Sequence, residues 1–220
     1  MSFPSAKAEG SITGYCMVGV LAKRKEGSMR INGRRMMMAH FAGKIAEGYL
    51  RCKSISNEFD RQRYATIDIG CIPSSSAQYE IIREGLTNHV VFGTDKISFV
   101  CGEAGFFVKE TINGSNVFRV WDGAQGVNHY IIGNNYLYNV NKAKTIVNGS
   151  PVAFESTENL CIFKGSSSIK IDYFAIKDGG HLIRDMYPAK EEATGLYGLW
   201  DNVERKFYTS TNGYKIIGYE

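Results

Sequence analysis

The sequence predicts an all-β fold in which two antiparallel sheets pack face to face as a jelly-roll sandwich. Aromatic residues make up 12% of the chain and 24 glycines are available for turns, a composition that favours pleated strands over helices. Six Asn-Gly or Asp-Gly pairs separate short apolar runs, which is typical of β-hairpins. No repeat at a fixed period is visible, so two packed sheets are the expected way to bury this many short strands.

Residues 1–48 differ from the rest of the chain in charge. They contain eight basic and three acidic residues, which gives +5, whereas the whole chain carries +4. This asymmetry indicates either an acidic partner or solvated side chains around a hairpin turn. We therefore divide the chain into an N-terminal docking or oligomerisation segment, 1–48, and a main domain, 49–220.

The N-terminal segment is itself expected to be structured. Residues 12–21 could form one strand, and Asn32-Gly33 predicts a small β-hairpin from residues 29–31 and 34–41. Met36, Met37 and Met38 give apolar side chains on both faces, for core packing or for an adaptable docking surface. The candidate docking residues are Arg30, Arg34, Arg35 and Met37.

Turn signals divide the main domain into strands. Asn113-Gly114 separates residues 106–112 from 117–121, Asn148-Gly149 separates 144–147 from 151–154, and Asn212-Gly213 separates 206–209 from 214–217. Residues 76–86 alternate well enough to be a strand. Such turns between β-rich runs favour antiparallel sheets over a β-α-β repeat.

A hairpin is also expected between residues 169–176 and residues 182–186. Asp178-Gly179 supplies the positive φ angles of a two-residue turn. Pro188 cannot donate a hydrogen bond, so we expect the second strand to end there or to lie at a sheet edge.

A series of residues around this hairpin has a known counterpart. The series is Lys170-Ile171, Phe174, Ile176, Asp178-Gly179, Leu182-Ile183-Arg184-Asp185 and Pro188, followed by Gly195-Leu196-Tyr197, Trp200-Asp201-Asn202-Val203 and Lys206-Phe207-Tyr208. It resembles the C-terminal signature of concanavalin-like (laminin-G-like) jelly-roll domains. The opening strand of those domains is similar to Tyr49-Leu50, Tyr64, Ile67-Asp68-Ile69-Gly70 and Ile72-Pro73, and Val91-Phe92-Gly93 stands where they start a hairpin. The resemblance covers about residues 49–220.

The resemblance implies a setting, because such domains occur in bacteriophage virion proteins and in surface proteins of gut bacteria. The expected function is a non-enzymatic structural protein of a phage head or tail fibre, with attachment to the host surface as a further role that such a lectin-like domain would allow. It would be assembled in the host cytoplasm as a homo-oligomer, a trimer or a dimer, with other virion proteins as partners of the N-terminal segment. The alternative is a carbohydrate-binding module of a bacterial surface protein.

The sequence offers no catalytic or metal-binding pattern. Related glycanases carry Glu-x-Asp-x-x-Glu on one strand, and this run is absent; Glu80 and Glu84 are expected to face solvent. The histidines His40, His89, His129 and His181 are scattered, and none has metal-ligand spacing with another His or a Cys. We predict no enzyme activity, no metal and no cofactor, and we read Asp201 as a turn residue that binds the backbone.

The remaining features bear on compartment and partners. The five cysteines form no Cys-x-x-Cys pair and are expected to be reduced and mostly buried, as in a reducing cytoplasm. No secretory leader and no apolar stretch of bilayer length are visible, so we expect no membrane insertion, and we expect no nucleic-acid partner.

Aromatic residues in a polar loop region are the candidates for sugar binding. Residues 128–130 and 133–136 combine amide, imidazole and phenol groups. The candidate ligand residues are Trp121, His129 and Tyr136; Tyr138 and Trp200 could also stack on a sugar, and burial in the core is the alternative for each aromatic side chain.

Overall fold

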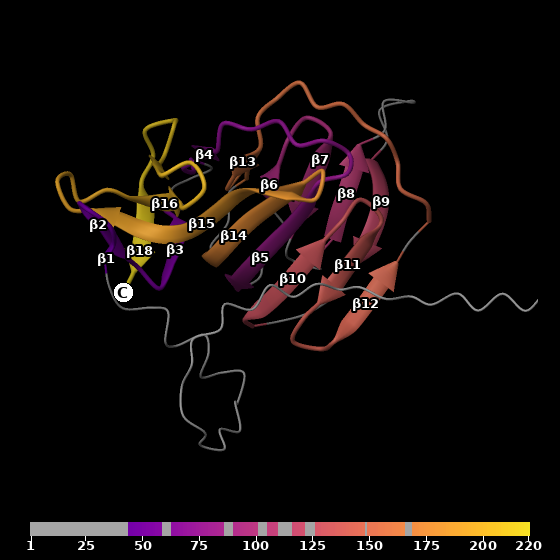
Figure 1. Ribbon diagram of the computed structural model, residues 1–220, viewed down its shortest axis with the longest axis horizontal. Helices are drawn as coiled ribbons and strands as arrows, with labels where there is room; N and C mark the ends of the chain where they lie inside the picture. The colour runs from indigo at the N-terminus through magenta and orange to yellow at the C-terminus, as the bar shows by residue number, and fades with distance from the viewer. Residues whose placement is uncertain are drawn as a thin grey trace, which may run out of the picture.

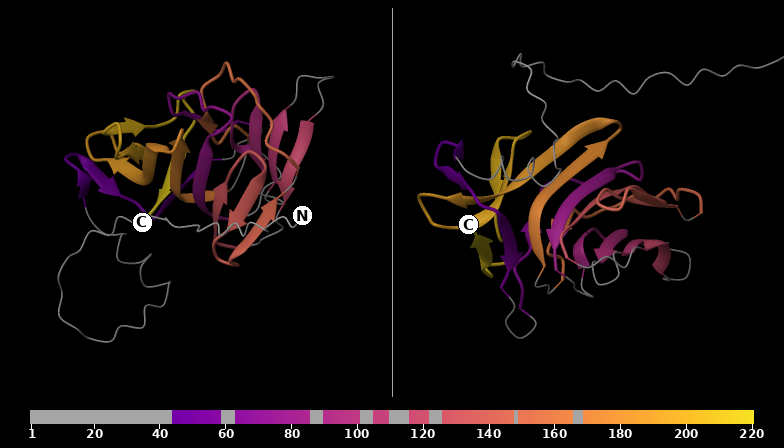
Figure 2. Two further views of the ribbon diagram at one scale, coloured as in Figure 1. Left: turned by 45° about the vertical axis from the view of Figure 1, so that its right-hand side comes forward. Right: turned by 90° about the horizontal axis from the view of Figure 1, so that it is seen from below.

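The computed structural model describes residues 44–58, 63–85, 90–100, 105–109, 116–121, 126–147, 149–165 and 169–220. Within these ranges all the regular structure is β-strand and there is no helix. The strands form two antiparallel sheets (Figure 1), and the view from below in Figure 2 shows them as separate layers. The predicted all-β sandwich is confirmed.

The larger sheet has twelve strands, and β14 lies at its centre, between β15 and β5. The chain order of these strands is β1 (Lys44–Ala46), β2 (Tyr49–Arg51), β3 (Ser54–Asn57), β5 (Gln78–Glu84), β10 (Asn128–Ile132), β11 (Tyr136–Asn139), β12 (Lys144–Val147), β14 (Lys170–Asp178), β15 (His181–Glu191), β16 (Tyr197–Asp201), β17 (Lys206–Tyr208) and β18 (Ile216–Tyr219).

The smaller sheet has six strands. They are β4 (Ile67–Asp68), β6 (Val90–Gly93), β7 (Ile97–Val100), β8 (Gly105–Lys109), β9 (Asn116–Trp121) and β13 (Cys161–Ile162). The chain passes repeatedly from one sheet to the other, for example from β5 to β6, from β9 to β10 and from β13 to β14. Such exchange of strands between two sheets is the connectivity of a jelly roll.

The core lies between the sheets and is centred on aromatic rings. On β5, Tyr79 and Ile81 point inward and are almost fully buried, as alternation along a strand requires. Phe92 of the smaller sheet contacts Tyr79, Phe99 and Phe174, each at a ring-centroid distance of 5.1 Å. These contacts join both layers, so Phe92 is the centre of the core.

Two of the predicted elements are found where they were expected. The alternating run at residues 76–86 is strand β5. Strands β8 and β9, on either side of Asn113-Gly114, pair in antiparallel register. The N-terminal residues Arg30, Arg34, Arg35 and Met37, with the expected strand at 12–21 and the hairpin at 29–41, lie outside the described residues. Strand β1 pairs with β2 across the expected boundary at residue 48.

The β14–β15 hairpin turns one residue later than predicted. Its two loop residues are Gly179 and Gly180, with φ of 56° and 81°, and Asp178 pairs with His181. Two consecutive glycines supply both positive φ angles without strain. Asp178 is therefore the last paired residue of β14 and not a loop residue of the turn. Its carboxylate accepts hydrogen bonds from another loop, as described below.

The predicted end of β15 at Pro188 was wrong, because the strand continues to Glu191. The strand that pairs with β15 on this side changes at Pro188. β14 pairs with β15 as far as Met186, and β2 pairs with it from Ala189 onward. The Pro188 carbonyl accepts a hydrogen bond from Cys52 N at 3.0 Å, just after β2 ends. A missing N–H at this junction interrupts neither ladder, which is why proline is tolerated.

At two of the predicted turns the flanking segments do not pair with each other. Strand β18 pairs with β3, and β17 pairs with β16, so Asn212-Gly213 joins strands that are not partners. After β12 the chain passes residues 151–154 without a strand. Asn-Gly favours a reversal of the chain, but the partner of each strand is decided by packing.

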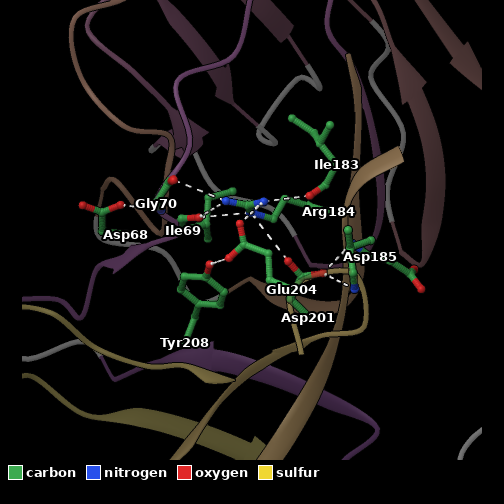
Figure 3. A network of polar contacts seen from close by, with 10 residues as sticks. Asp68, Ile69, Gly70, Ile183, Arg184, Asp185, Asp201, Glu204 and Tyr208 are labelled. Carbon is green, nitrogen blue, oxygen red and sulfur yellow. Dashed lines mark hydrogen bonds and ion pairs between the residues drawn. The ribbon is translucent and has the colours of Figure 1, made fainter. Parts of the chain in front are cut away.

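A buried arginine links the two layers (Figure 3). Arg184 on β15 is 5% exposed, and its Nε and Nη2 each donate to the Ile69 carbonyl at 3.1 Å, next to β4 of the smaller sheet. Nη2 also donates to the Gly70 carbonyl at 3.3 Å. Its positive charge is balanced by Glu204, whose Oε1 lies 2.7 Å from Nη1, and by Asp201, whose Oδ2 lies 3.6 Å from Nε.

The acids of this network hold the neighbouring turn. Asp201 is fully buried, and its Oδ1 accepts hydrogen bonds at 3.0 Å from the backbone N–H of Asp185 and of Val203. The predicted backbone-binding role of Asp201 is thus confirmed. Glu204 Oε2 accepts a hydrogen bond from the Tyr208 hydroxyl. The β16–β17 hairpin is therefore fastened to β15 by charge-assisted bonds.

Arg184→Met is expected to destabilise the protein by about 3–5 kcal/mol, because it leaves the buried Asp201 carboxylate without a counter-charge. Urea unfolding followed by tryptophan fluorescence measures this change. Lys177→Met, which removes an exposed positive charge on β14, is the control and should change the unfolding free energy by less than about 0.5 kcal/mol. Equal effects of the two substitutions would contradict the role given to Arg184.

A second buried ionisable group lies at a bulge in β14. Asp172 falls between Ile171 and Tyr173, where the pairing with β5 shifts register, and it is 8% exposed. Its Oδ1 has no hydrogen-bond partner within the described residues. Burial raises the pKa of Asp172 to about 7; the nearby Glu84 raises it further, while Lys53 and Lys170 lower it.

Asp172 is expected to make stability fall as pH rises. In the unfolded chain this carboxyl ionises above about pH 4, whereas in the folded protein it stays protonated to about pH 7, so the loss develops between these values. Asp172→Asn does not titrate and should gain roughly 2–4 kcal/mol over the wild type between pH 4 and pH 8. Urea unfolding at both pH values tests this, and parallel pH curves for the two proteins would refute it.

Candidate functional site

The main candidate site is a hollow at the tip of the β10–β11 hairpin, beside the start of β5 (Figure 1). Its volume is about 460 Å³, within the range of small-ligand sites. We call it the Tyr136 hollow; it is lined by Ser75, Ser76, Gln78, Gly133, Asn134, Asn135, Tyr136, Pro151, Val152 and Ala153. None of these lining residues carries a charge.

The aromatic wall of the hollow is held against a glycine. A Cβ at Gly133 would lie 2.2 Å from Cε1 of Tyr136, so the phenol ring lies directly against the backbone there. The hairpin closes through a hydrogen bond that Gly133 N donates to the Tyr136 carbonyl at 2.9 Å. Burial raises the pKa of the Tyr136 phenol.

Asn134 joins two other walls of the hollow. It is 8% exposed, and its Nδ2 donates to the Ser75 carbonyl at 3.1 Å and to the Val152 carbonyl at 2.5 Å. Its Oδ1 accepts from Val152 N at 2.9 Å. One side chain thus satisfies backbone groups of two loops that are far apart in sequence. Buried bonds of this kind make the walls rigid.

The serine loop is anchored by Asp178, the last paired residue of β14. Ser74 N donates to Oδ2 at 2.8 Å, and the Ser74 and Ser76 hydroxyls donate to Oδ1 at 2.5 and 3.1 Å. Burial of Asp178 raises its pKa, but the hydrogen bonds from Ser74 and Ser76 lower it more, and the net shift is downward. The carboxylate therefore stays ionised at neutral pH, where it accepts these hydrogen bonds from the loop.

His129 lies on the same face of the larger sheet but outside the hollow. It pairs with Glu80, with Nε2 2.7 Å from Oε1, and both side chains are partly buried. Glu80 was predicted to face solvent, and it is instead held by this pair. Glu84 is more exposed and lies 3.7 Å from Lys170 Nζ. Glu80 lines a smaller hollow of about 90 Å³, which shares Gln78 with the Tyr136 hollow.

The predicted ligand residues come from three different strands. Tyr136 lines the hollow, whereas His129 does not. His129 contacts Glu80, which lines the smaller hollow beside it. The backbone of Trp121 belongs to β9, in the other sheet. The expected loop at residues 128–130 is part of strand β10, and Trp200 is buried, with 6% exposed.

Sequence reasoning missed Gln78 and the 151–153 wall. Gln78 is the exposed first residue of an alternating strand, so its outward direction could have been read from the pattern. Val152 is held at the hollow by its hydrogen bond to Asn134, 18 residues earlier. No local sequence pattern indicates that contact.

Other classes of site are not found in the part of the chain that the structure describes. No group of three His, Cys, Asp or Glu residues could hold a metal there. Nor do these residues include a helix with the length and apolarity needed to cross a bilayer. Cys52, Cys71 and Cys161 are free thiols; burial raises the pKa of each, to about 11 for Cys71.

Comparison with known proteins adds no relative. No family model, curated protein or solved structure matches the chain.

Proposed function

We propose that this chain is a non-enzymatic structural protein of a bacteriophage virion whose lectin-like sandwich contacts a host-surface glycan. The observation that carries the glycan part is the Tyr136 hollow, a preformed, uncharged recess with one flat aromatic wall. Preformed sites lose little conformational freedom on binding.

The chemistry of the hollow suits a neutral sugar. A pyranose has one apolar C–H face, which packs on an aromatic ring, and hydroxyl groups that both donate and accept hydrogen bonds. The Tyr136 ring could cover the apolar face, while the amides of Gln78 and Asn135 offer donors and acceptors and the Ser76 hydroxyl, whose proton goes to Asp178, offers an acceptor. The absence of charge among the lining residues favours a neutral ligand over an acidic one.

The engagement of nearby acids supports a binding role rather than hydrolysis. Glycoside hydrolysis needs two carboxyl groups facing the scissile bond. In the described residues, Glu80 is paired with His129, Asp178 holds the serine loop, and Glu204 balances Arg184. None of these three carboxylates lines the Tyr136 hollow.

The virion setting is supported by the resemblance of residues 49–220 to concanavalin-like domains and by the separate charge of residues 1–48. In this proposal the N-terminal segment docks the protein onto the particle as a dimer or trimer, and the sandwich projects outward. A carbohydrate-binding module of a bacterial surface protein would use the same hollow, so glycan binding and particle incorporation are tested separately.

Tyr136→Ala is expected to weaken glycan binding at least about tenfold, because it removes the stacking surface. Neutral glycans retained on an array by the full-length protein would be titrated with wild type and variant. Tyr138→Ala, on the same face of β11 but outside the hollow, is the matched control. Unchanged affinity in Tyr136→Ala, or no glycan retained at millimolar concentration, would refute the proposed site.

Removal of residues 1–43 is expected to abolish incorporation into particles while glycan binding is retained. The cut leaves the β1–β2 pair intact, so the sandwich should still fold. Incorporation is measured by western blot of purified particles after complementation of a phage that lacks its own copy, and size-exclusion chromatography with light scattering gives the oligomeric state. Full incorporation of the truncated protein would show that the docking role is wrong.

A further inference from the structure

A second hollow is formed by residues of β15, β16 and β18 and of the segments that join the C-terminal strands. Figure 1 shows β16 and β18 at the other end of the larger sheet from the β10–β11 hairpin. The hollow has a volume of about 490 Å³. We call it the lysine hollow; it is lined by Lys190, Gly195, Leu196, Tyr197, Thr209, Ser210, Gly213, Tyr214, Lys215 and Ile216. The turn after β15 forms one wall, and the segment between β17 and β18 forms the other.

The lysine hollow is positively charged, unlike the Tyr136 hollow. Two of its lining residues are lysines, and none is acidic. The neighbouring Glu191 is engaged elsewhere, since its Oε1 accepts from the Tyr49 hydroxyl at 3.1 Å and its Oε2 from the Thr194 hydroxyl at 2.6 Å. Two ammonium groups at one recess indicate a ligand with a negative charge.

The threonine and serine hydroxyl groups of the lysine hollow already donate their protons to the protein, so a ligand must donate hydrogen bonds to them. The Thr209 hydroxyl donates its proton to the Tyr197 carbonyl at 2.8 Å. The Ser210 hydroxyl donates to Asn212 Oδ1 at 3.0 Å. Both oxygens therefore present only lone pairs to the recess, and a ligand would have to donate hydrogen bonds to them.

The Asn212 amide orientation, on which the Ser210 direction depends, is determined by its partners. Asn212 Nδ2 donates to the Tyr64 carbonyl at 2.8 Å, and Oδ1 accepts from Thr66 N at 3.3 Å. A carbonyl can only accept and a backbone N–H can only donate, so the amide cannot be flipped. Asn212 thereby holds this wall against the chain near β4.

The recess also has a fixed apolar surface. A Cβ at Gly218 would lie 1.9 Å from Cδ1 of Tyr197, so that ring is held against the β18 backbone. Tyr214 and Leu196 are 40% and 50% exposed at the same hollow. An exposed aromatic and apolar rim beside two lysines suits a ring with an apolar face and an anionic substituent.

We propose that the lysine hollow binds a carboxylated sugar of the uronic acid type. Its carboxylate would lie between Lys190 and Lys215, its hydroxyl groups would donate to Thr209 and Ser210, and its ring would pack on the Tyr197–Tyr214 side. Inorganic phosphate meets the charge requirement but has no apolar face and few protons to donate. This site is independent of the neutral-glycan site at Tyr136.

Methyl β-D-glucuronide tests the proposal against its uncharged counterpart, methyl β-D-glucoside. Each is titrated into ¹⁵N-labelled full-length protein, with the amide signals of Gly195 and Gly213 as reporters of the hollow. The glucuronide is expected to bind about tenfold more tightly, the usual gain from a charged hydrogen bond. The double variant Lys190→Gln/Lys215→Gln should bind both ligands equally, whereas the charge-matched control Lys177→Gln/Lys206→Gln should behave as the wild type.

Three outcomes would overturn the proposal. Equal affinity for the two sugars in the wild type would show that charge is not recognised. Glucuronide binding that survives the Lys190 and Lys215 substitutions would place the ligand elsewhere. Inorganic phosphate that shifts Gly195 and Gly213 at the same concentration as the glucuronide would reduce the hollow to a simple anion site. The Tyr136→Ala variant should give the same result in all three comparisons, because Tyr136 does not line the lysine hollow. A failure of the proposed neutral-glycan site can therefore be distinguished from a failure of this proposal.

Discussion

The buried Arg184 guanidinium is the interaction on which the arrangement of the domain depends. A charge removed from water must be fully paired and hydrogen-bonded. Besides a bond to the neighbouring Ile183 carbonyl, Arg184 reaches the Ile69 and Gly70 carbonyls beside the smaller sheet and the acids of the β16–β17 hairpin at once. Its pairing therefore sets β15 relative to the other layer and to the C-terminal strands (Figure 3).

Both hollows lie against elements that β15 positions. At one end of this strand, the hairpin with β14 presents Asp178 to the serine loop of the Tyr136 hollow. At the other end, β15 carries Lys190 into the lysine hollow. In each hollow an asparagine, Asn134 or Asn212, satisfies backbone groups of a distant segment. Rigid walls built in this way favour recognition without rearrangement.

The two hollows differ in charge although they are built alike. Uncharged groups line the Tyr136 hollow, and two lysines line the other. A host surface with both neutral and acidic sugars could therefore be contacted at two points by one chain. Under the proposed function, two weak sites on one body would raise overall affinity without any new contact, and the copies in an oligomer would add to this gain.

Local chemistry was enough to predict the class of fold and several strands. Alternation along β5 and the glycine turns between apolar runs reflect constraints that act within a few residues. The β8–β9 pair and the hydrogen bond from Val203 N to Asp201 were predictable for the same reason, whereas the bond from Asp185 N to Asp201 spans 16 residues and was not. Of the predicted ligand residues whose side chains the structure describes, Tyr136 lines the Tyr136 hollow and His129 does not.

The sequence by itself determined that this chain forms antiparallel sheets, because turn chemistry and alternation are local properties. Tertiary structure alone decided which strands are neighbours and where the hollows lie. Pro188 is tolerated inside β15 because two partners meet there, and Asn212 serves as an anchor because Thr66 lies beside it from 146 residues away. Such contacts follow from packing and from the need to satisfy buried polar groups, and neither is written in a local pattern.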